Sequence, residues 1–326
     1  MSNFISLWQA AVTFGTVILF GALGELITEK SGNLNLGTPG VMYFGGIASL
    51  IGAFFYESNA AQPNAVIGVL VALVCALVAS GLAGLLFCFL TTTLRANQNV
   101  TGLTLTILGS GVANFFGGSL NKLAGGVGQI SVATTSAGFR AVSPLANLGV
   151  VGKLLFSYGF LTYVAIVLAI LASLFLNRTR KGLNLRAVGE SPATADATGI
   201  NVTAYKYLST CVGSAITGLG GVFYTMNYIK GTWANDGTIE GLGWLALALV
   251  IFASWKSLNV IWGSYLFGIL YWLYFYIGGL TRYSQELFKM LPYLVTILVL
   301  IITSIRSKKE NKGPAALGLS YFREER

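Results

Sequence analysis

The sequence predicts an all-α polytopic membrane protein with about nine transmembrane helices (eight to ten) and a broken helix near residues 33–44. Of the 326 residues, 55% are hydrophobic and only 10% are charged. Soluble domains carry about 25% charged residues. The mean hydropathy is +0.73. Charge-free stretches also recur along the chain at lengths that suit a bilayer, which takes roughly 17–25 apolar residues to cross.

Nine windows without Asp, Glu, Lys or Arg mark the expected helices. Seven of them reach spanning length, whereas 241–255 and 290–305 are short. These two would rely on Lys256 and Lys289 snorkelling from their ends, or one of them is re-entrant. The windows are 1–24, 31–56, 58–94, 96–121, 154–177, 207–229, 241–255, 257–281 and 290–305.

The distribution of basic residues orients the chain. Nine crossings place the two termini on opposite sides of the membrane. If the C-terminus is inside, 14 of the 20 Lys and Arg residues lie on the inner side and 6 on the outer side. The positive-inside rule therefore predicts that the C-terminus and residues 178–206 are cytoplasmic and that residues 119–153 face outward. No basic residue precedes the first apolar run, so we expect a retained first helix instead of a cleaved signal peptide.

The first connection combines a carboxylate with an uncharged polar segment. Glu25 ends the first window and is expected to be interfacial or to pair with Lys30. Residues 31–40 are rich in Gly and Asn, which indicates either a helix entered through an unwound segment or a tight surface turn. Farther along the chain, Thr104 and Thr106 open the fourth helix, and we expect their hydroxyls to bond backbone or neighbouring helices.

Residues 178–206 form the most basic stretch between two apolar windows, with five Lys and Arg residues. Within it, Glu190–Ala197 is expected to form a short helix, because Pro192 suits a first turn and alanines favour helix. Gly199 is expected to end it. A short helix on a basic cytoplasmic loop favours a docking element, and an ordinary solvated loop is the alternative.

Several classes of chemistry are excluded by composition. The chain has no histidine, which removes His-based metal sites and Ser-His or Cys-His nucleophile pairs. Cys75, Cys88 and Cys211 lie in apolar runs without Cys-x-x-Cys spacing, so no disulfide is expected. No phosphate-binding or cofactor motif is present, and we expect no catalytic residue and no metal. The charge-free windows argue against proton or sodium coupling and favour a pore driven by another subunit.

Three motifs add a family resemblance. Residues 189–200 (Gly-Glu-Ser-Pro-Ala-Thr-Ala-Asp-Ala-Thr-Gly-Ile) resemble the cytoplasmic motif of bacterial ABC-importer permeases of the branched-chain amino acid, ribose and nucleoside group. Residues 24–37 and 97–106 resemble signatures of the nucleoside (basic membrane protein-linked) branch. Four positions depart from the pattern: Ser191 replaces the usual Asn, Thr194 and Asp196 vary the alanine-rich turn, and Pro39 stands where the nucleoside branch commonly has an acid.

The resemblance implies a permease subunit in the bacterial cell (plasma or inner) membrane, most simply for nucleosides. Sugar or branched-chain amino acid permeases of the same group are the alternative, and a secondary transporter without an ATPase is a further one. Implied partners are a second permease subunit, cytoplasmic ATP-binding subunits, an extracytoplasmic solute-binding lipoprotein and the lipid bilayer, with no nucleic acid. No cofactor is expected on this chain, since ATP and Mg would bind the partner ATPase.

The charge-free windows and the polar tail predict a domain layout, and the resemblance implies two groups of site residues. Residues 1–306 would form a single transmembrane permease domain, and residues 307–326 a polar, partly disordered cytoplasmic tail. ATPase coupling is implied for Gly189, Glu190, Ser191, Pro192, Ala195, Asp196, Ala197 and Gly199. The solute path is implied for Asn33, Asn35, Gly37, Thr38, Asn97, Gln98 and Thr104.

Overall fold

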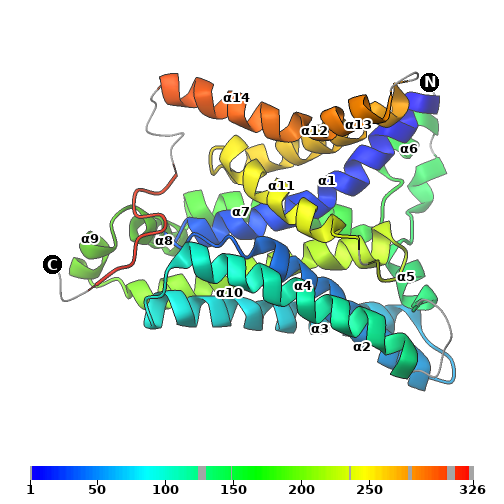
Figure 1. The fold of residues 1–326 in the computed structure, drawn as a ribbon, viewed down its shortest axis with the longest axis horizontal. Coiled ribbons are helices and arrows are strands. Elements are labelled where there is room, and N and C mark those ends of the chain that lie inside the picture. Colours follow the sequence, from blue (N-terminus) through cyan, green and yellow to red (C-terminus); the bar gives the residue numbers. More distant parts are fainter. Residues whose placement is uncertain are drawn as a thin grey trace.

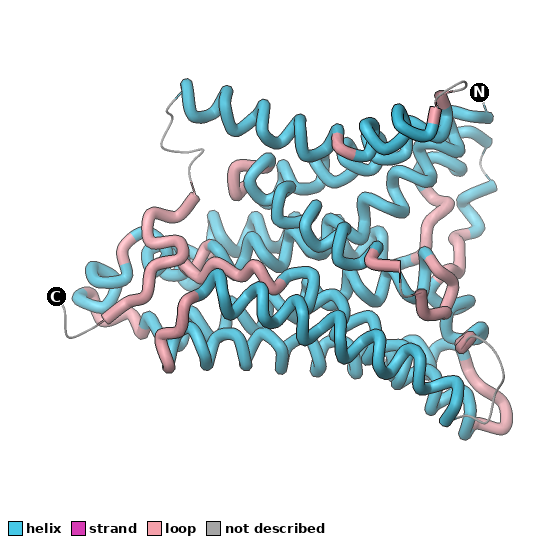
Figure 2. Tube along the Cα trace, viewed as in Figure 1, coloured by secondary structure: helices cyan, strands magenta, loops and turns pink. Residues whose placement is uncertain are grey.

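The computed structural model describes residues 2–123, 130–147, 149–234, 236–277, 281–306 and 313–322. Within those residues every regular element is a helix and no strand occurs, which confirms the all-α prediction (Figure 2). The elements are α1 Ser2–Glu29, α2 Thr38–Asn59, α3 Ala65–Cys88, η1 Phe89–Thr93, α4 Gln98–Leu123, α5 Ala133–Phe139, η2 Pro144–Asn147, α6 Gly149–Leu155, α7 Phe160–Arg178, α8 Arg180–Glu190, α9 Pro192–Ala197, α10 Val202–Val222, η3 Phe223–Tyr228, α11 Thr238–Phe252, α12 Ser257–Tyr276, α13 Arg282–Lys289 and α14 Leu291–Arg306.

Each of the nine charge-free windows falls on a helix, yet fewer than nine helices meet the length and hydropathy of a span. In the described part of the chain six do: Phe4–Glu29, Thr38–Asn59, Ala65–Thr93, Gln98–Ser119, Phe160–Arg178 and Ser257–Tyr276. The α13–α14 pair, bent by 44°, would be a seventh, and α11 is apolar but short. The chain is therefore a multi-pass membrane protein, and the count of nine crossings is not confirmed.

Helix α10 has the length of a span but fewer apolar residues, and its position explains this. It packs against α1, α2 and α3 in the middle of the bundle (Figure 1). A Cβ on Gly213 would lie 2.5 Å from the carbonyl oxygen of Gly24, and a Cβ on Gly45 would lie 2.5 Å from the Cα of Gly218. Five residues turn a helix by about 140° relative to its axis, so Gly213 and Gly218 face different neighbours. Close packing on two sides therefore covers much of the surface that a peripheral helix would present to lipid.

The unwound segment predicted between the first two helices is present but shorter than expected. Helix α1 ends at Glu29 and α2 begins at Thr38, so residues 30–37 form a mostly buried turn. Residues 38–44 are regular helix, so the broken region does not extend to residue 44. Pro39 lies in the first turn of α2, where a helix does not need the backbone N–H that proline lacks.

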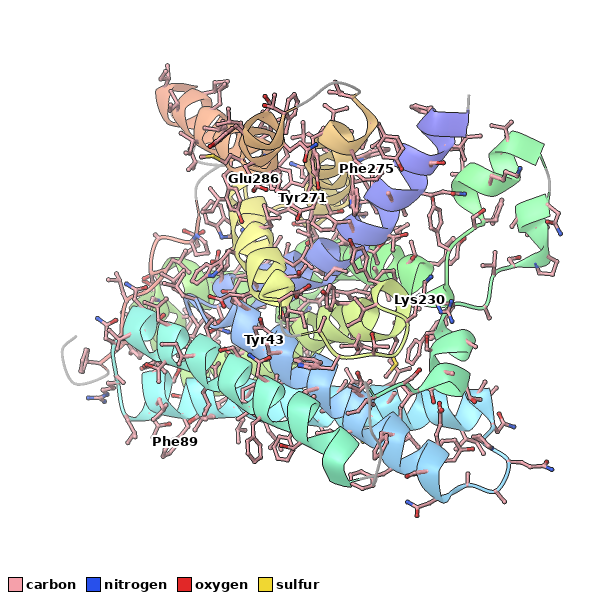
Figure 3. The ribbon with its side chains drawn as sticks, turned by 45° about the vertical axis from the view of Figure 1, so that its right-hand side comes forward. Tyr43, Phe89, Lys230, Tyr271, Phe275 and Glu286 are labelled. Carbon is pink, nitrogen blue, oxygen red and sulfur yellow. The ribbon has the colours of Figure 1, made fainter. Side chains whose placement is uncertain are left out.

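The two ends of the bundle carry different structures. The N-terminus lies at the same end as α5 and α6, whereas α8, α9 and the C-terminal segment lie at the other end (Figure 1). In segment 119–153, outside residues 124–129 and 148, three short helices follow α4. The amide of Thr135 in α5 donates to the Glu57 carboxylate at 2.6 Å, which fixes α5 to the end of α2. Tyr43 lies among the central helices, whereas Phe89, the first residue of η1, lies at the outer edge of the bundle (Figure 3).

Candidate functional site

The expected docking loop folds as two helices, α8 and α9, instead of one. The predicted helix start at Glu190 is wrong by two residues, because Glu190 closes α8 and α9 begins at Pro192. Ser191 lies between them in extended backbone, and its Oγ accepts from the Thr194 amide at 3.4 Å as an N-cap. Pro192 occupies the predicted first turn, and Gly199 follows α9 with φ of +85°. Helix α8 was not predicted from the sequence, because its glycines and basic residues are typical of a solvent-exposed loop.

The eight residues expected to couple to an ATPase differ in accessibility. Gly189 and Ala195 are buried, and Ala195 packs with Val188 and Val202 in a small apolar cluster that holds α9 on α8 and α10. The half-buried residues are Ser191, Pro192 and Asp196, and the exposed residues are Glu190, Ala197 and Gly199. A partner protein can therefore reach one face of α9 but not the glycine at the corner.

The α8–α9 corner touches the α1–α2 turn directly. A Cβ on Gly189 would lie 3.3 Å from the backbone nitrogen of Gly32 and closer still to the carbonyl oxygen of Lys30. Gly32 itself has φ of +86°, a conformation that favours glycine. Two glycines thus bring two backbones together, so that displacement of the corner must displace the turn.

Residues 313–322, here called the C-terminal strap, join these same two segments. The amide of Ala316 donates to the Gly189 carbonyl, and the amide of Gly318 donates to the Gly32 carbonyl, both at 3.0 Å. The Tyr321 hydroxyl donates to the Asp196 carboxylate at 2.7 Å. The tail was expected to be polar and partly disordered, but this part of it is packed. The apolar and aromatic residues near the end of the tail were the sequence feature that could have predicted this packing.

Glu25 organises the α1–α2 turn, a role that the sequence interpretation missed. Its buried carboxylate accepts from the Asn35 amide at 3.1 Å and from the Thr38 hydroxyl at 2.8 Å. The expected pair with Lys30 does not form in the described residues, where the recorded ion pair is Lys289–Glu286. The carboxylate instead satisfies donors of the unwound backbone, as buried polar groups require.

The remaining solute-path residues separate into two groups. Asn33 is buried and donates to the Thr210 hydroxyl at 2.9 Å, and Gln98 is buried and accepts from the Leu34 amide at 2.7 Å. Gly37 also belongs to the turn, since its amide donates to the Asn35 side chain at 2.9 Å.

Two predicted path residues lie elsewhere. Asn97 is exposed and caps α4 by accepting from the Asn99 and Val100 amides. Thr104 is exposed and bonds to its own helix, at the Val100 carbonyl. Thr106 reaches the turn instead, because it lies on the other face of α4 and donates to the Leu36 carbonyl at 3.1 Å.

The described residues do not gather the donor groups of a metal centre: no three His, Cys, Asp or Glu side chains come together among them. The site as built is a buried hydrogen-bonded turn, held by backbone contacts to an exposed pair of short helices. Such an arrangement can transmit a displacement from one end of the bundle into its interior.

Comparisons with known proteins show which family this chain belongs to. The family model described as branched-chain amino acid transport system / permease component matches residues 8–300. The chain is 32% identical to the putative glucose ABC transporter permease protein TsgC13 of Haloferax volcanii, with 99% of each chain covered. It is 31% identical to the nucleoside ABC transporter permease protein NupC of Lactococcus lactis, with 96% of this chain and 95% of the relative covered.

A third relative is the guanosine ABC transporter permease protein NupQ of Bacillus subtilis, 30% identical over 97% of this chain and 96% of the relative. No solved structure matches the chain significantly. The family match spans nearly the whole helical bundle, including the α1–α2 turn and the α8–α9 pair. This multi-pass membrane protein therefore belongs to the permease-component family of the branched-chain amino acid transport systems.

Proposed function

We propose that this chain is the permease subunit of an ATP-driven importer and forms half of the transmembrane path for nucleosides. The observation that carries the nucleoside assignment is its similarity, along more than nine-tenths of its length, to permeases named for nucleosides and for guanosine. The motifs at residues 24–37 and 97–106 support the same branch. In the fold, they lie at the α1–α2 turn and at the start of α4 that contacts it.

The proposed topology has nine crossings, with the C-terminus, α8 and α9 in the cytoplasm of the cell membrane. The separation of the N-terminus from α8, α9 and the strap at opposite ends of the bundle supports an odd number of crossings (Figure 1). The excess of Lys and Arg at the α8–α9 end supports the orientation. The three spans beyond the six are α10 with η3, α11, and α14.

The proposed partners are a second permease subunit, ATP-binding subunits and an extracytoplasmic solute-binding lipoprotein. A shorter match to the nucleoside ABC transporter permease protein NupB of Lactococcus lactis, over 33% of this chain, supports a paired permease of related sequence. ATP and Mg would be held by the ATP-binding subunits. This chain would bind no cofactor and carry out no catalysis.

The exposed face of α9 would dock on the ATPase, and the buried turn beneath it would respond. Ala193, Thr194 and Ala197 are exposed on α9, whereas Gly189 and Ala195 support it from within. The corner contact between Gly189 and the α1–α2 turn supports transmission toward the path. In that turn, Asn33, Asn35, Thr38 and the start of α4 are the proposed path-lining groups.

Uptake by reconstituted complexes tests the proposal. The chain would be placed in proteoliposomes with its second permease, ATPase and binding lipoprotein, and ATP-dependent accumulation of guanosine, uridine and glucose would be compared. We expect accumulation of nucleosides only. Accumulation of glucose alone would favour the second candidate, which rests on the 32% identical glucose permease relative. Uptake driven by an ion gradient without the ATPase would contradict the importer class.

Two substitutions on α9 separate docking from folding. Ala193→Arg and Pro192→Arg add a bulky cation to the accessible face and are expected to abolish solute-stimulated ATP hydrolysis without loss of membrane insertion. Gly189→Trp is a weaker test of docking, because Gly189 is buried and the indole would disrupt the corner itself. Unchanged stimulation and uptake in both α9 variants would contradict the docking role.

A further inference from the structure

A pocket of about 490 Å³ lies at the α8–α9 end of the bundle, and neither α9 nor the proposed path contributes a residue to its lining. It is bounded by the end of α7, by Arg186 of α8 and by the connection between α11 and α12. Three cations line it, namely Lys30, Arg186 and Lys256, together with the neutral donors Ser257 and Asn259. The residues that line it include no carboxylate.

In the described part of the chain, two of these cations, Lys30 and Arg186, are not neutralised by a contacting carboxylate. Among the described residues neither Lys30 nor Arg186 has a carboxylate within 4.0 Å, and the recorded bond of Arg186 goes to the neutral Asn177 side chain at 3.2 Å. Burial and the charge of Arg186 lower the pKa of Lys30, while Glu190 and Glu29 act on it in the opposite direction. The pocket therefore gathers cations that repel one another in the absence of an anion.

The start of α12 adds to the positive field. This helix of 20 residues opens on the pocket, and its N-cap residue Lys256 makes no side-chain cap. The N-terminal end of a helix carries partial positive charge and amides without intrahelical partners. Next to it, Ser254 and Trp255 have φ of +51° and +54°, which side chains other than glycine seldom adopt. The wall of the pocket is thus held in an uncommon conformation by its surroundings.

Apolar side chains lead away from the pocket along the two helices that border it. On α12, Leu258 lines the pocket, and Trp262 and Leu266 follow at intervals of four residues, all of them exposed. On α7, which packs against α12, Ile170 and Leu174 are exposed within two turns of the pocket. Residues spaced by four share one face of a helix. A basic pocket therefore continues into an apolar surface that runs toward the middle of the bundle.

We propose that this pocket binds an anionic phospholipid, with the headgroup phosphate between Lys30, Arg186 and the start of α12 and the acyl chains along α7 and α12. Basic pockets between transmembrane helices on the cytoplasmic side suit anionic headgroups. The apolar continuation selects a lipid over a free phosphate ester, which would leave that surface unused. Because Lys30 follows α1 and Arg186 belongs to α8, the lipid would also bridge the α1–α2 turn and the helix that precedes α9.

Lipid retention in nanodiscs tests this proposal and does not depend on the transported solute. The full chain would be placed in nanodiscs of phosphatidylcholine containing about one-fifth phosphatidylglycerol, and retained lipids would be counted by native mass spectrometry. The wild type is expected to retain phosphatidylglycerol preferentially. Lys30→Gln and Arg186→Gln should each weaken that preference about tenfold or more, since each removes a charge-assisted hydrogen bond.

The matched control is Lys181→Gln, which removes an equal charge from an exposed position on α8 outside the pocket. It should retain phosphatidylglycerol as the wild type does, and equal retention in all four proteins would overturn the proposal. Should a pocket variant fail to fold, Arg186→Lys is expected to keep the preference, and Leu258→Glu, at an exposed position, is expected to lose it. Retention in Leu258→Glu equal to that of the wild type would also overturn it.

Inorganic phosphate distinguishes a lipid from a free phosphate ester. In nanodiscs of phosphatidylcholine alone, millimolar phosphate is expected to leave the thermal unfolding midpoint unchanged, whereas adding phosphatidylglycerol should raise it in the wild type and not in Arg186→Gln. A rise with phosphate that phosphatidylglycerol does not increase further would assign the pocket to a free phosphate ester and overturn the lipid assignment.

Discussion

Replacing Gly189 with alanine is expected to separate the α8–α9 corner from the α1–α2 turn. The added methyl group would lie 3.3 Å from the Gly32 nitrogen and closer still to the Lys30 carbonyl oxygen. Both are backbone atoms and cannot rotate aside, so the corner must shift by about 1 Å to restore ordinary contact distances. Overpacking of this kind costs about 1–3 kcal/mol.

The same shift weakens the strap, because the Gly189 carbonyl accepts from the Ala316 amide at 3.0 Å. Loss of that bond costs about 1 kcal/mol, so the free energy of unfolding should fall by about 2–4 kcal/mol in total. Unfolding of the full chain in detergent, followed by tryptophan fluorescence, measures the stability. Transport coupling is measured as nucleoside accumulated per ATP hydrolysed in the reconstituted complex, and it should fall as well.

Gly241→Ala is the matched control, because a Cβ at Gly241 meets no atom within 4 Å. It makes the same chemical change within a helix and should be neutral or slightly stabilising, since alanine favours helix over glycine by about 1 kcal/mol. If Gly189→Ala unfolds at the same midpoint as Gly241→Ala and couples normally, the corner contact does not transmit displacement.

Three further predictions follow from the same end of the bundle. Glu25→Ala should lower the free energy of unfolding by about 2–4 kcal/mol, because two buried donors lose their acceptor. Glu25→Gln keeps an acceptor oxygen and should lower it by about half as much. Equal losses for the two variants in chemical unfolding would contradict the hydrogen-bonding role of Glu25. Tyr321→Phe should lower the free energy of unfolding by about 1 kcal/mol, because the hydrogen bond to Asp196 is lost. Truncation after residue 312 removes the whole strap and should lower it further. A truncated chain with wild-type stability would show that the strap does not stabilise the fold. Burial lowers the pKa of Lys30 in the folded chain. Between that pKa and the ordinary value of about 10.4, the unfolded chain binds more protons than the folded chain, so the free energy of unfolding rises with pH. In detergent without anionic lipid this rise should be smaller in Lys30→Met than in the wild type, and identical pH profiles of the unfolding midpoint would refute the prediction.

The sequence by itself determined the class of the protein and the identity of its polar segments. Charge-free windows of spanning length leave only helices as a solution in lipid, because backbone groups there must bond within their own segment. The basic residues between two of these windows had to lie at an end of the bundle, which located the segment 178–206, and the Gly- and Asn-rich residues 31–40 indicated the unwound turn. The Pro192 start of α9 and the glycine after it followed from local backbone preferences.

Only the tertiary structure decided which side chains act together. Glu25 bonds to the turn instead of to Lys30 because the chain folds back and brings Asn35, ten positions later, and Thr38 against its carboxylate. Thr106 reaches the turn and Thr104 does not, because the rotation of α4 about its axis depends on its neighbours. The strap, the basic pocket and the burial of Gly189 arise from contacts between segments far apart in the sequence, and such contacts leave no periodic signal in it.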